Sequence, residues 1–371
     1  MRIGCPKEIK NHEYRVGLTP ESARELARHG HEVWIESGAG LGIDATDPEY
    51  VAAGAKIVDG PDPIFAECEM IVKVKEPQAG ERKKLREGQI LYTYLHLAPD
   101  RDQTVDLVNA GVTAIAYETV TGPRGSLPLL KPMSQVAGRM SVQAGANALE
   151  KAHGGRGVLL GGVPGVMPGK VIVIGGGVVG FNAAQMAVGL GADVTILDRD
   201  PEVLEKVGTH FEARAATRFS NEANLQDALS TADLVIGAVL IPGAAAPKLV
   251  TREQLKDMQQ GSVLVDVAID QGGCFETSKA TTHDDPTYKI DGVVHYCVAN
   301  MPGAVARTST YALNNVTLPH ALQIADHGWK QAMRANPHLA EGLNVWDGKV
   351  TYRAVAEDLG YDYVPVETAL A

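Results

Sequence analysis

Four side chains that can bind an ion or transfer a proton lie at or after the ends of apolar segments of the sequence. Lys75 ends MIVKVK, His96 ends QILYTYLH and Asp270 ends SVLVDVAID. Arg15 comes after the first apolar segment, RIGC. An Arg fork can bind a carboxylate through two hydrogen bonds, whereas a Lys offers a point charge. Histidine titrates near neutral pH and suits proton transfer. These side chains together suit a small substrate that carries a carboxylate.

Each of these residues also has a simpler interpretation. A single His is more often structural, Arg15 could form a surface ion pair, and Asp270 could cap the turn at the glycines that follow it. Lys75 and His96 support each other, because adjacent parallel strands would deliver both to one edge of a sheet. Lys73 would share a face with Lys75 in an alternating strand, and we expect it to be solvated or to snorkel to the surface.

The segment KVIVIGGGVVGF contains the most specific motif of the chain. An expected strand over 171–174 leads directly into Gly175-x-Gly177-x-x-Gly180, and a helical segment follows. Gly175 would make the tight turn, Gly177 would let the backbone approach a pyrophosphate, and Gly180 would let the helix pack on the strand. Amide groups at the helix N-terminus would bind the phosphates. The alternative is a glycine-rich turn in an unrelated α/β domain.

A second expected strand of this motif, DVTILD, ends in Asp198, 18 residues after Gly180. A carboxylate at this position would accept hydrogen bonds from a ribose diol and would repel a 2′-phosphate. Arg199 and Lys206 weaken that preference without reversing it. The motif therefore predicts a dinucleotide site for NAD rather than NADP.

Strand-like and helix-like segments alternate along the chain, and such alternation indicates parallel sheets. There are two such series, with long helices expected near 134–153 and from 308 to 327 at the seams. We expect an α/β protein with two doubly wound Rossmann-like domains. The NAD-binding domain, residues 129–306, would be inserted into a discontinuous substrate and catalytic domain, residues 1–128 and 307–371.

Local signals place some helices. Thr19, Pro20 and Glu21 form an N-cap, a first-turn Pro and a first-turn acid, so a helix is expected from there to about His29. Gly30 would end it. The segment KKLREG is expected to be the helix between MIVKVK and QILYTYLH.

The composition excludes several classes of partner. The 371 residues include 34 basic and 45 acidic side chains, with no Lys/Arg cluster dense enough for nucleic acid. No segment resembles a signal peptide or a membrane span, so we expect a cytoplasmic protein that does not bind membranes. Its four cysteines form no CxxC motif and are expected to be reduced and half-buried.

Several blocks together resemble the L-alanine dehydrogenase family, and the match runs nearly end to end. These blocks include KVKEP, PLLKPMSQVAGR, GGRGVLLGGVPGV, LVDVAIDQGGCFE and YCVANMPGAVARTSTYALNN. The resemblance implies a two-domain protomer, usually assembled as a homohexamer. It also implies a reversible reaction in which L-alanine, NAD and water give pyruvate, ammonium and NADH.

The resemblance assigns roles to individual residues. Those matching Arg15 and Lys75 bind the substrate carboxylate and carbonyl, and those matching His96 and Asp270 are catalytic. Some relatives have a basic residue where this chain has Val203, which cannot make a polar contact with the cofactor. The positions that match cofactor contacts are Ser134, Val178, Val179, Asp198, Ser220, Val239, Leu240, Val267, Ala268, Ile269, Asp270, Lys279, Val298, Ala299, Asn300 and Met301.

Glu118 and His327 match a magnesium site of the family. Two ligands alone do not define a metal site, and a structural role for both is the simpler interpretation. No metal is therefore assigned from the sequence.

Two other functions fit the same dinucleotide motif. One is the soluble NAD-binding part of a proton-translocating transhydrogenase, which has a similar fold but no amino-acid substrate. The other is an NAD(H)-binding regulatory module without catalytic activity. Arg15, Lys75, His96 and Asp270 fit a substrate carboxylate better than they fit either alternative.

Overall fold

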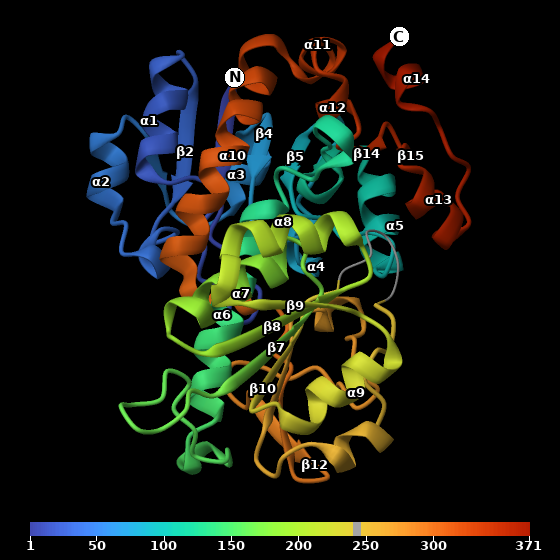
Figure 1. The fold of residues 1–371 in the computed structure, drawn as a ribbon. Coiled ribbons are helices and arrows are strands. Elements are labelled where there is room, and N and C mark those ends of the chain that lie inside the picture. Colours follow the sequence, from blue (N-terminus) through green and yellow to red (C-terminus); the bar gives the residue numbers. More distant parts are fainter. Residues whose placement is uncertain (240–245) are drawn as a thin grey trace. The chain divides into compact units, whose positions relative to one another are not determined.

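The computed structural model describes residues 1–239 and 246–371, and the chain divides into two compact units (Figure 1). Unit 1 comprises residues 1–133 and 303–371, and unit 2 comprises residues 134–302. Unit 2 is thus an insertion between two segments of unit 1, and the predicted α/β class with one unit inserted in the other is confirmed. The sequence placed the two boundaries after residues 128 and 306.

Unit 1 is built on an eight-stranded sheet with the order β15-β14-β6-β5-β4-β1-β2-β3. Strands β1 to β6 pair in parallel, and β14 pairs antiparallel with both β6 and β15. The order 3-2-1-4-5-6 is that of a doubly wound dinucleotide-binding sheet. The strands are β1 Arg2–Cys5, β2 Glu32–Glu36, β3 Lys56–Val58, β4 Met70–Val72, β5 Ile90–Thr93, β6 Thr113–Ala116, β14 Leu343–Trp346 and β15 Lys349–Val350.

Unit 2 repeats this arrangement with a seven-stranded sheet, β12-β13-β11-β10-β7-β8-β9. All neighbours are parallel except β12, which pairs antiparallel with β13. Counted within the unit, the parallel strands again follow the order 3-2-1-4-5-6. The strands are β7 Lys170–Ile174, β8 Asp193–Asp198, β9 Ala216–Phe219, β10 Leu234–Gly237, β11 Val263–Asp266, β12 Thr287–Ile290 and β13 Val293–Tyr296.

Helices connect the strands of each sheet. Those of unit 1 are α1 Pro20–Arg28, η1 Leu41–Ile43, α2 Asp47–Ala52, α3 Asp62–Glu67, α4 Ala79–Arg82, α5 Arg101–Ala110, η2 Tyr117–Thr119, η3 Pro123–Gly125, α10 Ala306–His327, α11 Trp329–Ala335, α12 Pro337–Ala340, α13 Arg353–Leu359 and α14 Val366–Leu370. Those of unit 2 are η4 Lys151–His153, α7 Val178–Gly189, α8 Pro201–Phe211, η5 Glu212–Arg214, α9 Glu222–Thr231, η6 Glu253–Asp257 and η7 Ile269–Gln271. The two unit boundaries fall within α6 Lys131–Ala148 and η8 Met301–Val305.

Local signals account for the first helix but not for the fourth. The hydroxyl of Thr19 accepts a hydrogen bond from the amide of Ser22 at 3.2 Å, which is the predicted N-cap of α1. The predicted helix KKLREG is wrong, because residues 83–88 are turns and irregular chain, and α4 ends at Arg82. The first-turn acid of α4, Glu81, accepts from the amide of Gln78 at 2.7 Å, and so caps a helix that begins earlier than expected.

The core of unit 2 covers both faces of its sheet. Val171 and Val173 pack in one apolar cluster, whereas Ile172 and Ile174, which alternate with them along β7, pack in another. A parallel sheet buried on both faces explains the continuous apolar runs of the sequence. The four cysteines are free and fully buried, rather than half-buried as predicted.

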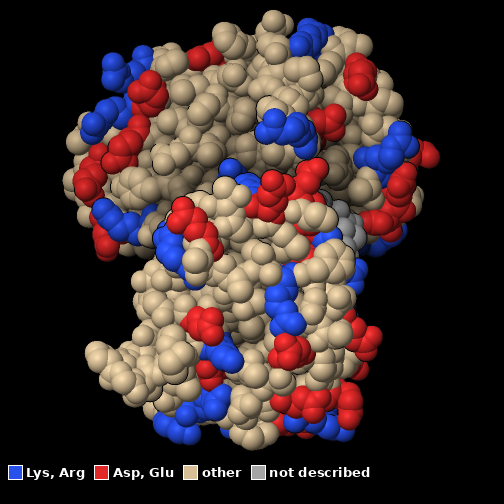
Figure 2. Space-filling model, in the orientation of Figure 1, with Lys and Arg blue, Asp and Glu red and all other residues tan. Residues whose placement is uncertain are grey.

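The surface carries charges of both signs. On the face drawn in Figure 2, basic and acidic side chains are interspersed over each unit. Within the described ranges, no helix is long and apolar enough to cross a membrane.

Candidate functional site

Lys75 and His96 lie at the same edge of the sheet of unit 1. Their strands β4 and β5 are parallel neighbours, but each ends three residues before the predicted functional residue. The two chain segments stay together beyond the sheet. The amide of Tyr94 donates to the carbonyl of Val74 at 3.2 Å, and the hydroxyl of Thr93 donates to the carbonyl of Lys75 at 3.0 Å. Both side chains therefore come from turns that follow strands, not from the strands themselves.

His96 is exposed on this edge and is held through its backbone. Its φ is +51°, and its amide donates to Glu118 at 2.6 Å. The amide of Leu95 donates to the same carboxylate at 3.2 Å. The imidazole stacks on Tyr94, with ring centroids 5.8 Å apart, and its Nδ1 lies 4.0 Å from Glu118. Glu118 thus fixes the turn that presents the imidazole.

Arg15 is buried, with 2% of its side chain exposed, and forms an ion pair with Glu13. Its Nε donates to Oε1 of Glu13 at 2.6 Å, and one terminal nitrogen lies 3.1 Å from the sulfur of Met133. Burial lowers the pKa of Arg15, but the hydrogen bond and charge of Glu13 raise it overall. Burial raises the pKa of Tyr94, and the charge of Arg15 opposes that shift. The predicted alternative of a surface ion pair for Arg15 is therefore wrong.

The structure also corrects the prediction for Lys73. Its side chain is fully buried rather than solvated, and its ammonium lies 3.1 Å from Glu8 and 2.9 Å from Glu81. Strand β4 ends at Val72, so the two-residue alternation that grouped Lys73 with Lys75 does not apply. Sequence reasoning missed both carboxylates, because Glu8 lies 65 residues before Lys73 and Glu81 lies in a short helix that the sequence did not predict.

The glycine motif of unit 2 forms the turn between β7 and α7. Gly175 has a φ of +100°, a conformation that only Gly adopts readily. A Cβ on Gly180 would lie 1.7 Å from the carbonyl oxygen of Gly175, so only Gly allows this close approach of helix and strand. A Cβ on Gly177, the N-cap of α7, would meet nothing within 4 Å. Val178 and Val179 are the first residues of α7, so their amides lie at its N-terminus.

Asp198 ends β8 beside this turn. Its carboxylate accepts from the amide of Gly176 at 2.6 Å and from that of Asp200 at 2.9 Å. The amide of Ser220 donates to the carbonyl of Asp198 at 2.8 Å, which brings a second predicted cofactor residue next to it. Val203 packs at the same turn, because its Cγ1 would lie 2.7 Å from a Cβ on Gly176.

Asp270 is exposed in η7, four residues after β11 ends at Asp266, so the predicted strand SVLVDVAID is too long. The buried carboxylate of Asp266 organises this loop. It accepts from the amides of Ala268 at 3.0 Å and Cys274 at 2.9 Å, and from the hydroxyl of Ser278. The capping role considered for Asp270 thus belongs to Asp266, which the sequence analysis did not single out.

The other predicted cofactor residues mostly follow the carboxyl ends of strands, where ligands bind in doubly wound sheets. Val239 follows β10, Val267 to Ile269 follow β11, and Val298 to Met301 follow β13. Ser134 lies on α6 and Lys279 is exposed in a loop. Leu240 lies outside the described residues.

The two candidate metal ligands have different surroundings. The carboxylate of Glu118 accepts hydrogen bonds from the amides of Leu95 and His96. His327 is exposed at the end of α10. In the part of the chain that the structure describes, no group of three or more His, Cys, Asp or Glu side chains could hold a metal ion.

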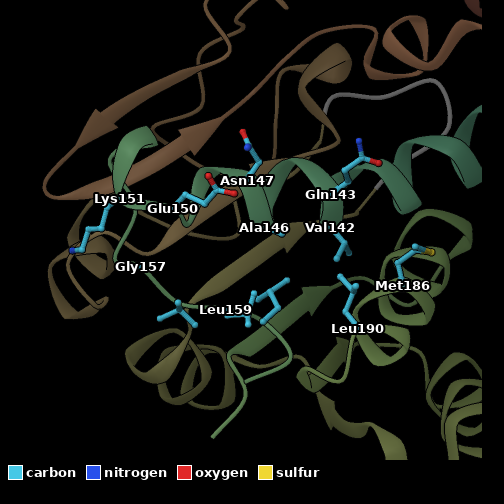
Figure 3. Close-up of a pocket in the computed structure, with 12 residues that line it drawn as sticks. Val142, Gln143, Ala146, Asn147, Glu150, Lys151, Gly157, Leu159, Met186 and Leu190 are labelled. Carbon is cyan, nitrogen blue, oxygen red and sulfur yellow. The ribbon is translucent and has the colours of Figure 1, made fainter. Parts of the chain in front are cut away.

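A groove of about 680 Å³ lies in unit 2, apart from the predicted site residues. Figure 3 shows Val142 of α6, Leu159 of the following loop and Leu190 after α7 directed toward it. Next to this groove, the loop over 159–167 exposes much of Val163, Val166 and Met167. This surface is apolar, whereas basic and acidic side chains are interspersed elsewhere on the face drawn in Figure 2.

Two family models match most of the chain. The N-terminal domain model of alanine dehydrogenase/PNT matches residues 4–137, and the C-terminal domain model matches residues 141–353. The chain belongs to the alanine dehydrogenase/PNT family.

Individual relatives place the chain within this family. The alanine dehydrogenase of Halomonas elongata is 60% identical over 98% of both chains. A solved structure of L-alanine dehydrogenase is 52% identical, with a TM-score of 0.94 over 100% of both chains. The transhydrogenase from Sinorhizobium meliloti is 27% identical, with a TM-score of 0.81 over 95% of this chain and 100% of its own. The alanine dehydrogenase/PNT fold is thus common to all three, and the sequence is nearer to the two alanine dehydrogenases.

Proposed function

We propose that this chain catalyses the reversible NAD-dependent oxidative deamination of L-alanine to pyruvate and ammonium. This proposal is supported by the position of Lys75 and His96 at one sheet edge of unit 1, and by the closeness of Arg15 to Tyr94, on whose pKa its charge acts. It is also supported by the similarity of the chain to alanine dehydrogenases over nearly its full length. A transhydrogenase domain or an NAD(H)-binding regulatory module has no amino-acid substrate and does not need these side chains. Those alternatives are not favoured.

NAD, when bound, supplies the acceptor for the hydride of the substrate. The turn between β7 and α7 fits its pyrophosphate, because Gly177 leaves open space above the helix N-terminus. Asp198 would hold the adenosine ribose, beside Ser220. The remaining contacts come from Ser134, Val178, Val179, Val239, Leu240, Val267, Ala268, Ile269, Asp270, Lys279, Val298, Ala299, Asn300 and Met301.

Each substrate residue has a chemical role. Arg15 and Lys75 hold the carboxylate, and Lys75 also polarises the carbonyl or imine. His96 exchanges a proton with the substrate oxygen as water adds and leaves. Asp270 stabilises the iminium cation and the ammonia. In the oxidative direction the substrate amine must be neutral before hydride leaves.

The decisive experiment measures NADH oxidation with pyruvate and ammonium. Turnover supports the proposal, and binding of NADH without turnover would support one of the two alternatives. The rate of L-alanine oxidation at saturating substrate should rise from pH 7 to pH 10, because more of the amine is neutral. A rate independent of pH over this range would contradict the proposed order of steps.

We further propose that the chain assembles as a homohexamer in the cytoplasm. The apolar loop and groove of unit 2 support self-association, because exposed apolar patches of this kind mark interaction surfaces. The four free, buried thiols are typical of a reducing compartment.

A further inference from the structure

Lys73 belongs to a buried cluster of charges directly before Lys75. Its ammonium lies 3.1 Å from Oε2 of Glu8 and 2.9 Å from Oε1 of Glu81. The exposed fraction of the side chain is 0% for Lys73, 2% for Glu8 and 4% for Glu81. We refer to Glu8, Lys73 and Glu81 as the buried charge cluster.

Stability alone does not explain this cluster. Replacing a buried ion pair by apolar side chains is often neutral or stabilising, because desolvation of the charges offsets their attraction. Burial lowers the pKa of Lys73, but the two carboxylates raise it overall, so the ammonium stays charged. Burial raises the pKa of Glu8, and the charge of Lys73 opposes that shift. A buried charge retained at this cost suggests a role in geometry.

The second oxygen of Glu8 reaches the backbone that carries the proposed substrate lysine. It accepts from the amide of Val74 at 2.7 Å and from the amide of Lys75 at 3.3 Å. The carbonyls of the same two residues accept from the amide of Tyr94 at 3.2 Å and from the hydroxyl of Thr93 at 3.0 Å. Both amides and both carbonyls of Val74 and Lys75 therefore form hydrogen bonds, although these residues lie beyond the end of β4.

The cluster also fixes the chain after Lys75. Oε2 of Glu81 accepts from the amide of Gln78 at 2.7 Å, while its Oε1 binds Lys73. Lys73 thus joins two carboxylates, one of which holds the amide of Lys75 and the other the turn that follows. Hydrogen bonds to a charged acceptor are stronger than neutral ones, so the two bonds of 2.7 Å, from Val74 to Glu8 and from Gln78 to Glu81, restrict the backbone on both sides of Lys75.

We propose that Glu8 and Lys73 are positioning residues of the substrate site: Lys73 holds the Glu8 carboxylate, and this carboxylate fixes the backbone from which Lys75 reaches the substrate. The inference rests on the proposed function, in which Lys75 binds pyruvate. A substrate site must hold its groups to within about 0.5 Å through supporting hydrogen bonds, and Lys75, which lies beyond the end of β4, has no ladder of the sheet to supply them.

Two variants of similar shape test this role, Lys73→Met and Glu8→Gln. In both, Lys75 is present but its backbone is less restricted, so the KM for pyruvate should rise at least tenfold while the KM for NADH changes less than twofold. Hydrogen–deuterium exchange of the peptide over 70–78 should become faster. Lys73→Arg, which keeps the charge, should recover part of the pyruvate KM.

A matched control separates positioning from stability. Arg156→Met removes an ion pair of 2.6 Å with Asp233 in unit 2 and should lower Tm without changing the KM for pyruvate. If Lys73→Met and Glu8→Gln fold and keep a pyruvate KM within twofold of the wild type, the inference is overturned. If Lys73→Met does not fold, Glu8→Gln decides, because it removes the charge of Glu8 and replaces the oxygen that accepts from Lys73 with an amide nitrogen that cannot accept.

The outcome for this inference is distinguishable from that for the proposed function. Absence of turnover in the wild type would overturn the proposed function. The hydrogen–deuterium exchange experiment does not depend on enzyme activity. Faster exchange over 70–78 in the variants would still support the role of Glu8 and Lys73 in fixing the backbone of Lys75. Unchanged exchange in both variants would overturn it, whatever the activity of the wild type.

Discussion

His96 shows how a single residue is presented for chemistry. Its left-handed backbone conformation is uncommon for residues other than Gly and costs on the order of 1–3 kcal/mol. The hydrogen bonds from the amides of Leu95 and His96 to Glu118 offset that cost. The result is an exposed imidazole on a backbone that cannot easily relax.

The variant His96→Ala tests the proposed proton transfer. Turnover of pyruvate and ammonium should fall by about 10²–10⁴-fold, the usual contribution of a general acid or base. NADH binding, measured by fluorescence titration, should change little. His153→Ala is a matched control, because its side chain is 45% exposed against 46% for His96, and it should keep wild-type turnover. Wild-type turnover in His96→Ala would contradict the assignment.

His295 makes the stability of unit 2 depend on pH. Its ring is buried, accepts from or donates to Thr277 at 2.7 Å and stacks on Tyr288. Burial lowers its pKa below the ordinary value of 6.5. The unfolded chain therefore binds the proton more tightly than the folded one, and stability is lost as the pH falls below about 6.5.

Thermal or urea unfolding at pH 7 and pH 5 measures this effect. The contribution of His295 to the free energy of unfolding should be smaller at pH 5 than at pH 7. His295→Gln, which does not titrate, should lose correspondingly less stability on acidification, although it is less stable than the wild type at pH 7. An equal loss in both proteins would exclude His295 as the source.

At the scale of elements, the turn between β7 and α7 depends on one glycine. In Gly180→Ala the new Cβ would lie 1.7 Å from the carbonyl oxygen of Gly175, so the helix must move away from the strand. Such overpacking costs about 1–3 kcal/mol. The Kd for NADH, measured by fluorescence titration, should rise at least tenfold, because the amides that face the phosphates are displaced.

A second glycine of α7 serves as the control. A Cβ on Gly189 would meet nothing within 4 Å, so Gly189→Ala should leave the Kd for NADH unchanged and should not lower Tm. If Gly180→Ala also bound NADH as tightly as the wild type, the turn would not be the pyrophosphate site.

The sequence predicted the elements better than it predicted their ends. Apolar runs and caps located β4, β5, β11 and α1, because these signals are local. The alternating pattern of MIVKVK continued past Val72, where the chain leaves the sheet. The partners of Lys73 could not be found by spacing, since Glu8 lies 65 residues earlier and contacts it only in the folded chain. For the same reason Asp266 looked like part of a strand, and its role in the loop of Asp270 was missed.

The whole molecule uses one strand order twice. The parallel strands of both sheets have the order 3-2-1-4-5-6, and in each sheet most of the predicted functional residues follow the carboxyl ends of these strands. In unit 1 these residues carry charges for a small acid, and in unit 2 they include a glycine turn. The same architecture thus presents different chemistry through the turns that follow its strands.

Assembly is tested by light scattering, where the wild type should have the mass of a hexamer. Val166→Asp places a charge on the apolar loop of unit 2 and should give smaller species, because Val166 is 64% exposed next to the groove. Val51→Asp is the control, since Val51 is 57% exposed on α2 of unit 1. A wild-type monomer would contradict the proposed hexamer.

The insertion of unit 2 has a consequence for synthesis on the ribosome. The outer edge of β6 is covered by β14, but Leu343 is made 227 residues after Ala116. At about 5–20 residues per second, the nascent chain carries an open strand edge for roughly 10–45 s. Because such edges pair with other chains, we expect β6 to be the segment of the nascent chain that most needs a chaperone.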